Sequence, residues 1–173
     1  MRIGSLLRFL CFFCNLKLLI RLLQDLKRYS EDCVLPQLKL ERGAGTFIHP
    51  SVSISNPHNI KVGISVRIQM SSILWASDNA RISVGNYSGL GPGVKVYTSN
   101  HKFGAGARYI DQPWEESDVT IGDNVWVGSG TVLLAGVRIG DNSVIAAGSV
   151  VNKDIPSDCL AAGVPCRVVR GVT

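Results

Sequence analysis

The sequence predicts an all-β fold, a parallel β-solenoid that follows an α-helical segment. Two observations support this. Over residues 120–151 an aliphatic residue recurs every six positions, usually with glycine or another small residue after it. Over residues 6–28 a leucine-rich, basic run contains neither glycine nor proline. A chain of 173 residues, 46% of them hydrophobic, is expected to form one domain with an appendage.

The appendage is residues 1–42, in which residues 6–28 are expected to form a helix. Residues 16–28 are amphipathic, with an aliphatic face opposite a basic stripe. The aliphatic face comprises Leu16, Leu19, Ile20, Leu22, Leu23 and Leu26, and the stripe Lys17, Arg21 and Arg28. Two interpretations stay open. The helix packs on its own fold or on a sister subunit, or residues 6–28 make a peripheral membrane contact with the stripe facing anionic lipid.

Neither a membrane span nor a signal peptide is expected in this segment. Its longest uncharged run, residues 9–16, is far short of the roughly 20 residues that cross a bilayer, and no small-residue cleavage site follows. Cys11 and Cys14 form a C-x-x-C within an apolar run. Reduced cysteines that behave as small hydrophobes are favoured over a redox or metal site, and they fit a cytoplasmic protein.

The six-residue repeat predicts the architecture of residues 43–173. The anchors are Ile121, Val127, Leu133, Ile139, Ile145 and Val151. A helix buries positions about 3.6 residues apart and a half-buried strand every second residue, so neither explains the spacing. Three short strands per turn give a triangular coil of about 18 residues, with turns stacked about 4.8 Å apart. Ile121 is therefore expected to lie directly beside Ile139.

Two breaks interrupt the repeat, at residues 75–82 and 102–119. The longer break predicts a loop over about residues 97–119 that leaves the coil. Long loops on rigid scaffolds often carry functional residues. This makes the loop the first place to look for chemistry.

His101, at the root of this loop, is the candidate catalytic residue. The chain has three histidines, and His49 and His58 lie in turn sequences where a surface role is expected. An imidazole titrates near neutral pH and can take a proton from a hydroxyl group. No serine or cysteine nucleophile motif accompanies it, so a base acting directly on a bound acceptor fits better than a covalent relay.

The run IGDNVWVG…GVRIGDNSVIAAGSVVNKDIP…AGVPCRVVR is distinctive. It strongly resembles the hexapeptide-repeat O-acetyltransferases, closely over residues 119–170 and loosely back to about residue 48. These are left-handed parallel β-helix enzymes, among them the galactoside and maltose acetyltransferases. The first 40 residues are more similar to acetyltransferases of polysaccharide biosynthesis. The left hand is implied by the resemblance alone, since most parallel β-structure crosses over right-handed.

The resemblance also implies roles for individual residues. His101 would be the general base in a ternary complex with acetyl-CoA, in a homotrimer whose active sites lie between subunits, with no metal required. The residues implied in acetyl-CoA binding are Trp126, Ser129, Ala147, Asn152, Lys153, Arg167 and Arg170. The Ser129 N–H would face the developing oxyanion, the Ala147 N–H the pantetheine arm, and the two arginines the phosphates. The alternatives are that Trp126 is an ordinary wall residue of the coil and that the two arginines lie in a solvated tail.

The acceptor-binding residues of the family are assigned less directly to this chain, because residues 68–80 do not align with the relatives without gaps. The candidates for sugar contact are Trp75, Asp78 and Asn100. A backbone carbonyl or a loop acid, Glu115 or Glu116, is the candidate for orienting the imidazole.

The predicted function is O-acetyl transfer from acetyl-CoA to a sugar hydroxyl of a cell-surface polysaccharide or lipopolysaccharide precursor, in the cytoplasm or at the inner face of the membrane. The alternatives are transfer to a small xenobiotic or to serine, and a non-catalytic scaffold. A carbonic-anhydrase-like metal enzyme is disfavoured because His49 and His58 lie far along the chain from His101. Nucleic acid is not expected as a partner, because outside residues 1–42 ten Lys and Arg stand against nine Asp and Glu.

Overall fold

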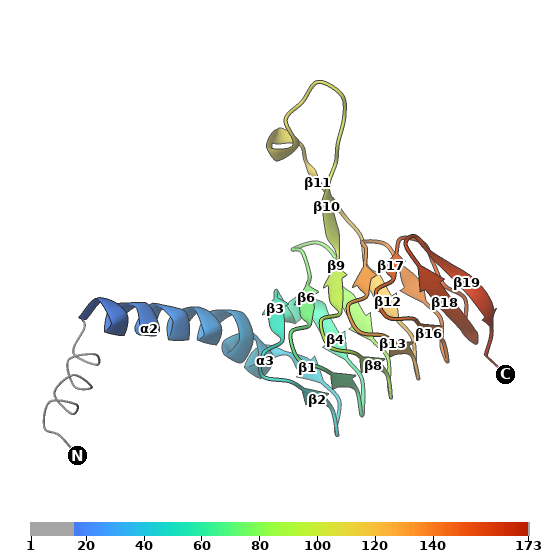
Figure 1. The fold of residues 1–173 in the computed structure, drawn as a ribbon, viewed down its shortest axis with the longest axis horizontal. Helices are drawn as coiled ribbons and strands as arrows, with labels where there is room; N and C mark the ends of the chain where they lie inside the picture. The colour runs from blue at the N-terminus through green and yellow to red at the C-terminus, as the bar shows by residue number, and fades with distance from the viewer. Residues whose placement is uncertain (1–15, 173) are drawn as a thin grey trace, which may run out of the picture.

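The structure, a computed structural model, describes residues 16–172; the expectations for residues 1–15, including the Cys11–Cys14 pair, lie outside this part. Figure 1 shows a helix projecting from one end of a β-helix and a hairpin standing out from its side. The β-helix is a left-handed parallel coil of about five turns, which confirms the predicted fold class.

Each turn contributes three short strands. In chain order the turns are β1 (Glu41–Arg42), β2 (Phe47–Ile48) and β3 (Ser53–Ser55); β4 (Ile60–Val62), β5 (Arg67–Ile68) and β6 (Ile73–Trp75); β7 (Ile82–Val84), β8 (Gly89–Leu90) and β9 (Lys95–Tyr97); β12 (Val119–Ile121), β13 (Trp126–Val127) and β14 (Val132–Leu133); β15 (Arg138–Ile139), β16 (Val144–Ile145) and β17 (Val150–Val151). The first, second and third strands of successive turns pair in parallel, and form sheets A, B and C respectively.

The inward-facing anchors make the core. Ile121 pairs with Ile139 in sheet A, as the six-residue register predicts. The corners need small residues because the backbone of the next turn passes close by: a Cβ added at Gly85 would overlap the carbonyl of Gly122. Buried hydroxyls near the corners are all hydrogen-bonded, as buried polar groups generally are. They belong to Ser72, Ser88, Thr98, Thr131, Ser143 and Ser149.

Helical structure closes the first turn and runs further than predicted. The helix α2 (Leu16–Tyr29) continues through a π-helical turn, η1 (Ser30–Val34), into α3 (Leu35–Lys39). Gln37 of α3 donates its side-chain amide to the carbonyls of His49 and Val52, at 3.2 and 3.3 Å. Pro36 does not stop the helix because it occupies the first turn of α3, where its missing N–H is tolerated. The first coil strand begins at residue 41, two residues before the predicted domain start.

An antiparallel hairpin closes the other end. β18 (Cys159–Gly163) extends sheet B, and β19 (Cys166–Gly171) turns back along it. Cys159, Cys166 and Cys33 of η1 are buried free thiols, and burial raises the pKa of Cys33 and Cys166. These three cysteines therefore behave as the small hydrophobes that the sequence suggests.

The segment predicted as a loop contains a second antiparallel hairpin. β10 (Ser99–His101) pairs with β11 (Trp114–Glu116), and the connection includes a short 3-10 turn, η3 (Tyr109–Asp111). The base of the hairpin is tied to the other break in the repeat: Asn79 N–H donates to Glu116 Oε2 at 3.0 Å, and Arg81 N–H to Asp118 Oδ1 at 2.8 Å. The two interruptions of the coil thus lie together in space.

Candidate active site

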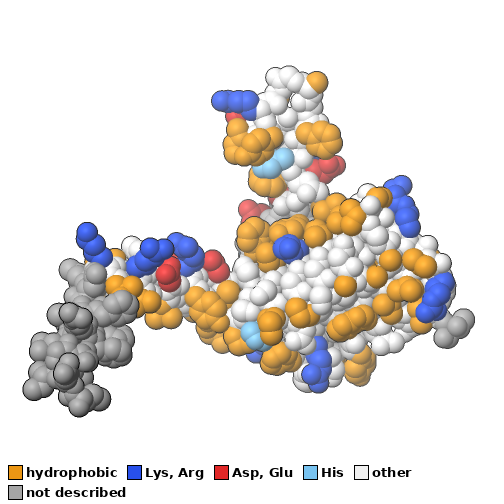
Figure 2. Space-filling view, in the orientation of Figure 1, with side chains coloured by type: hydrophobic (Ala, Val, Ile, Leu, Met, Phe, Trp, Pro, Cys, Tyr) orange, Lys and Arg blue, Asp and Glu red, His pale blue; other side chains and the backbone are white. Residues whose placement is uncertain are grey.

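His101 is held in the hairpin by aromatic rings. It pairs with Trp114, and the two ring centroids are 3.8 Å apart with a tilt of 32°. The Tyr109 ring meets the imidazole at 5.4 Å and 84°. Figure 2 shows a histidine among hydrophobic side chains in the projecting hairpin. Stacking on one side and an edge contact on another fix the plane of the imidazole.

The imidazole retains an unused nitrogen. His101 Nδ1 is buried and has no hydrogen-bond partner among residues 16–172. A buried polar atom without a partner is rare and needs an explanation, such as a catalytic role or a ligand. His101 lines an open cleft of about 610 Å³ together with Asn100, Lys102, Phe103 and Glu115. The ring is therefore fixed in place beside a cleft, with its Nδ1 unpaired.

The loop acids do not orient His101 within the described chain. Glu115 stands opposite Asn100 in the hairpin register, and Glu116 accepts the hydrogen bond from Asn79. Among the candidates for sugar contact, Asn100 shares the cleft with His101.

The other two candidates for sugar contact, Trp75 and Asp78, lie on the coil. Trp75 Nε1 donates to Ser53 Oγ at 3.1 Å, and its ring meets Tyr97 edge-on at 5.9 Å. Asp78 Oδ1 accepts from Asn56 Nδ2 at 3.0 Å. These contacts fix the corner of the coil below the hairpin, and no described contact joins either residue to His101.

The remaining histidines lie in turns, as predicted. His49 follows β2, with its Nδ1 2.8 Å from Ser51 Oγ, and His58 lies in the 3-10 turn η2 (Pro57–Asn59). Within residues 16–172 no group of three His, Cys, Asp or Glu side chains is placed to hold a metal ion.

Ser129 and Ala147 lie one turn apart, at the corner between sheets B and C. Their backbone N–H groups have no hydrogen-bond partner in the described chain, whereas the N–H groups of Gly128 and Gly148 bond to neighbouring turns. Both residues are exposed. Stacked turns are about 4.8 Å apart, so the corner presents two free donors in a row. Such donors suit the carbonyl oxygens of an extended amide or thioester ligand.

The C-terminal hairpin brings two other predicted residues together. Arg167 Nη1 donates to Asn152 Oδ1 at 3.4 Å. Arg170, also on β19, donates to the carbonyl of Gly171 at 3.1 Å. Both guanidiniums and Lys153 are exposed, and no carboxylate pairs with any of the three in the part of the chain that the structure describes. This end of the coil is positively charged and available to anions.

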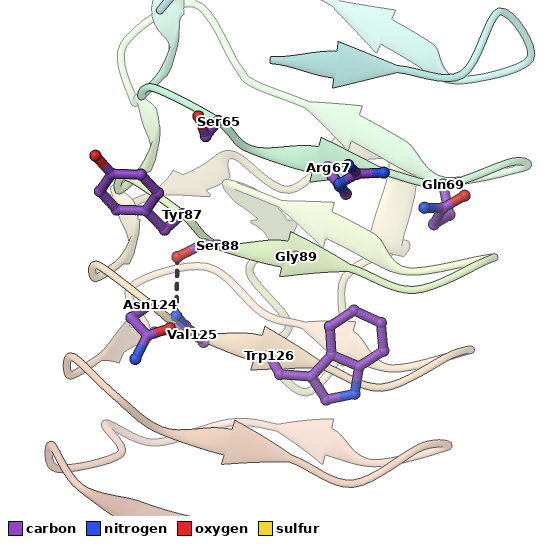
Figure 3. Close-up of a pocket in the computed structure, with 9 residues that line it drawn as sticks. All are labelled: Ser65, Arg67, Gln69, Tyr87, Ser88, Gly89, Asn124, Val125 and Trp126. Atoms are coloured by element: carbon purple, nitrogen blue, oxygen red, sulfur yellow. Dashed lines mark hydrogen bonds between the residues drawn. The ribbon is translucent and has the colours of Figure 1, made fainter. Parts of the chain in front are cut away.

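Trp126 lies on the outer face of sheet B, beside a recess of about 360 Å³ that the sequence analysis missed. Arg67, Gly89 and Trp126 stand in one column of the sheet register, so a glycine separates two large outward side chains. Figure 3 shows the recess, with Gly89 between Arg67 and Trp126. All three residues of this column can be read from the sequence. That they are neighbours becomes clear only when the three turns of the coil are aligned.

The chain is similar to known acetyltransferases in sequence and structure. Residues 118–153 match the bacterial transferase hexapeptide family (six repeats). Galactoside O-acetyltransferase of Escherichia coli K12 is 38% identical over 143 residues, which cover 83% of this chain and 69% of that relative. A hexapeptide-repeat acetyltransferase of Vibrio cholerae, solved with acetyl-CoA, is 30% identical with a TM-score of 0.73, covering 86% of this chain and 78% of that one. A maltose O-acetyltransferase of Clostridium difficile is 35% identical with a TM-score of 0.68, covering 78% and 70%.

The fold and the likeness to these acetyltransferases identify an acyltransferase of the β-helical class. With the sequence identity above, the chain belongs to the hexapeptide-repeat acetyltransferases. The predicted family and the predicted enzyme class, an acetyl-CoA-dependent acetyltransferase, are thereby confirmed.

Proposed function

We propose that the protein transfers an acetyl group from acetyl-CoA to a sugar hydroxyl, with His101 as general base. The observation that carries this proposal is the imidazole fixed by Trp114 and Tyr109, with a buried nitrogen left without a partner. The relatives named galactoside and maltose O-acetyltransferases support a sugar as the acceptor.

The chemistry is a direct transfer in a ternary complex. The acceptor oxygen attacks the thioester carbonyl carbon while the imidazole of His101 takes the hydroxyl proton. The resulting oxyanion accepts a hydrogen bond from the Ser129 N–H, which is free in the structure. When the tetrahedral intermediate collapses, the C–S bond breaks and the imidazolium returns the proton to the departing thiolate. The products are the acetyl ester and coenzyme A with a free thiol.

Acetyl-CoA is proposed to lie along the corner between sheets B and C. The thioester end lies near Ser129, and the pantetheine arm passes the free N–H of Ala147. The phosphates reach Lys153, Arg167 and Arg170 at the end of the coil, where no described carboxylate competes for the cations.

A homotrimer is proposed because the site is incomplete in one chain. The hairpin carries His101 away from the coil (Figure 1). No described contact connects His101 with Ser129 or Ala147. The corner of free donors on one subunit would lie beside the imidazole of the neighbouring subunit. Threefold symmetry would repeat that arrangement at each interface.

The test is acetyl-CoA turnover, followed as thiol release, with a panel of sugars and nucleotide sugars. His101→Ala is expected to lose about 100-fold or more in kcat, the size of a positioned general base. His58→Ala, in an exposed turn, is the matched control and keeps the wild-type rate. Unchanged turnover in His101→Ala would exclude His101 as the base, and failure to bind acetyl-CoA would favour a non-catalytic scaffold.

We further propose that α2 lies on an anionic membrane surface, where precursors of cell-surface glycans would be met. Figure 2 shows basic side chains along one side of the helix and hydrophobic ones along the other. Four Lys and Arg stand against one Asp in its 14 residues. Leu19, Ile20, Leu22, Leu23 and Leu26 are 46–63% exposed. No helix within residues 16–172 is long and apolar enough to cross a membrane, so a surface contact is what is proposed.

Vesicle co-sedimentation tests the membrane contact. Binding to phosphatidylglycerol vesicles is expected to exceed binding to phosphatidylcholine vesicles and to fall as salt rises. The double variant Leu22→Asp/Leu26→Asp is expected to abolish it. If the wild-type protein does not bind anionic vesicles, and the double variant differs from it in oligomeric state, the apolar face is covered by a sister subunit.

A further inference from the structure

We propose that the recess on sheet B is an anion-recognising acceptor subsite, so that the enzyme acetylates sugars that carry a carboxylate or a phosphate. This rests on the proposed acetyl transfer and adds to it the class of acceptor. The shared chemistry is an oxyanion group on a sugar, either the carboxylate of an acidic sugar or the phosphate of a phosphorylated or nucleotide-linked sugar.

One wall of the recess is an indole that lies over a glycine. On the outer face of sheet B, Gly89 pairs with Arg67 on one side and with Trp126 on the other. A Cβ at Gly89 would lie 2.7 Å from Cε3 of the indole, so any larger residue would displace the ring. The volume of the recess, about 360 Å³, falls within the range of small-molecule sites.

The charge of the recess is unopposed. Of the nine residues that line it, only Arg67 is charged. No ion pair or hydrogen bond engages its guanidinium in the described chain. Figure 3 shows Arg67 and Gln69 on the strand next to Gly89, with Ser65 further along. A planar guanidinium fork matches carboxylate and phosphate oxygens, and the neighbouring amide and hydroxyl can serve the sugar hydroxyls.

Two exposed aromatic side chains also border the recess. Trp126 is 49% exposed and Tyr87 is 67% exposed, and both line the recess. Tyr87 has φ +59°, whereas the stacked corner positions with the same conformation, Ser65 and Asn124, carry short polar side chains. A bulky residue in the left-handed region is strained, and such strain collects at functional sites. Tyr87 thus lies at a strained corner that borders the recess.

The recess also lies beside the proposed donor site. Trp126 precedes Ser129 by three residues on the same turn, and a Cβ at Gly91 would lie 2.8 Å from the Ser129 nitrogen. The Gln69 end of the recess therefore opens toward the corner with the free N–H groups. An acceptor whose anion binds Arg67 has its sugar ring directed toward the thioester.

The first experiment compares initial rates for glucuronic acid, glucose 1-phosphate and UDP-glucose with those for neutral glucose and galactose. Wild type is expected to prefer an anionic acceptor. Arg67→Gln is expected to raise KM for that acceptor about 10- to 100-fold, with kcat and the KM for acetyl-CoA changed less than about threefold. Arg67→Lys is expected to recover part of the loss. Arg138→Gln, an exposed arginine on sheet A, is the matched control and should match wild type.

The outcomes distinguish a carboxylate from a phosphate as the anion that is bound. They also distinguish failure of the proposed subsite from failure of the proposed acetyl transfer. A KM effect with glucuronic acid alone identifies a carboxylate, and one with the phosphorylated sugars alone identifies a phosphate. Preference for neutral sugars, or a rise in KM for acetyl-CoA only, overturns the subsite. Calorimetric binding of the same acceptors to wild type and to Arg67→Gln does not depend on turnover. Anion binding that is lost in the variant while no acceptor stimulates thiol release would reject the acetyl transfer and keep the subsite.

Discussion

The imidazole of His101 is positioned by ring contacts. Catalytic histidines are commonly fixed by a hydrogen bond to an acid or a carbonyl. In His101, Trp114 stacks on the ring and Nδ1 stays unpaired within the described chain. Residue-level chemistry of this kind was only partly predictable. A histidine at the start of the longest interruption of the repeat could be selected from the sequence. Its aromatic partners depend on the pairing of the two hairpin strands, which no local sequence pattern predicts.

Tyr87 provides a stability prediction at the same scale. Tyr87→Asn is expected to stabilise the fold by about 1 kcal/mol, because asparagine tolerates the left-handed conformation better and little buried area is lost. For a chain of this size that corresponds to a rise in Tm of about 2–4 °C. Thermal unfolding followed by circular dichroism measures it.

The control is Tyr87→Phe, which keeps both the ring and the strain and should leave Tm near the wild-type value. A fall in the Tm of Tyr87→Asn would show that the tyrosine is not strained. The same variant is expected to bind the acceptor more weakly, so stability and activity change in opposite directions at this position.

Among the structural elements, the coil was far more predictable than its interruptions. The anchors recur at six residues, so the register of each strand with the next turn follows from short-range sequence alone, as the pairing of Ile121 with Ile139 shows. The hairpin depends on pairing residues 99–101 with residues 114–116 across a long connection. The predicted helix ended at residue 28, whereas helical structure continues to Lys39, because Pro36 lies in the first turn of α3 where its missing N–H is tolerated.

The corners of the coil give the prediction at this scale. Gly85→Ala is expected to destabilise the fold by about 1–3 kcal/mol, because the added methyl would overlap the carbonyl of Gly122. Chemical denaturation would measure the loss. Gly104→Ala is the control, because a Cβ there meets only the Gln112 side chain at 3.8 Å. Equal stabilities for the two variants would show that the corner can relax without cost.

For the whole molecule, the proposed division of the site between subunits can be tested by complementation. His101→Ala lacks the proposed base, and Ala147→Trp is expected to block the corner that would face it from the neighbouring subunit. Co-expressing the two inactive variants should restore about a quarter of the wild-type activity, because one site in four of a randomly mixed trimer has both parts intact. Turnover by the purified mixed protein measures it.

The control is His101→Ala co-expressed with the double variant His101→Ala/Ala147→Trp, which leaves every site without a base. If the first mixture stays inactive although mixed trimers form, base and donor wall belong to the same chain. Light scattering on each preparation establishes that the trimer is present.

The hairpin is inserted between the third and fourth turns, yet the turns on either side pair as if nothing lay between them. Val96 of β9 lies beside Leu133 of β14 in unbroken register. An insertion at a corner of such a coil can be lengthened, shortened or exchanged without altering how the neighbouring turns stack. Evolution, or a protein engineer, can therefore replace the segment that carries His101 and leave the backbone of the Ser129–Ala147 corner as it is.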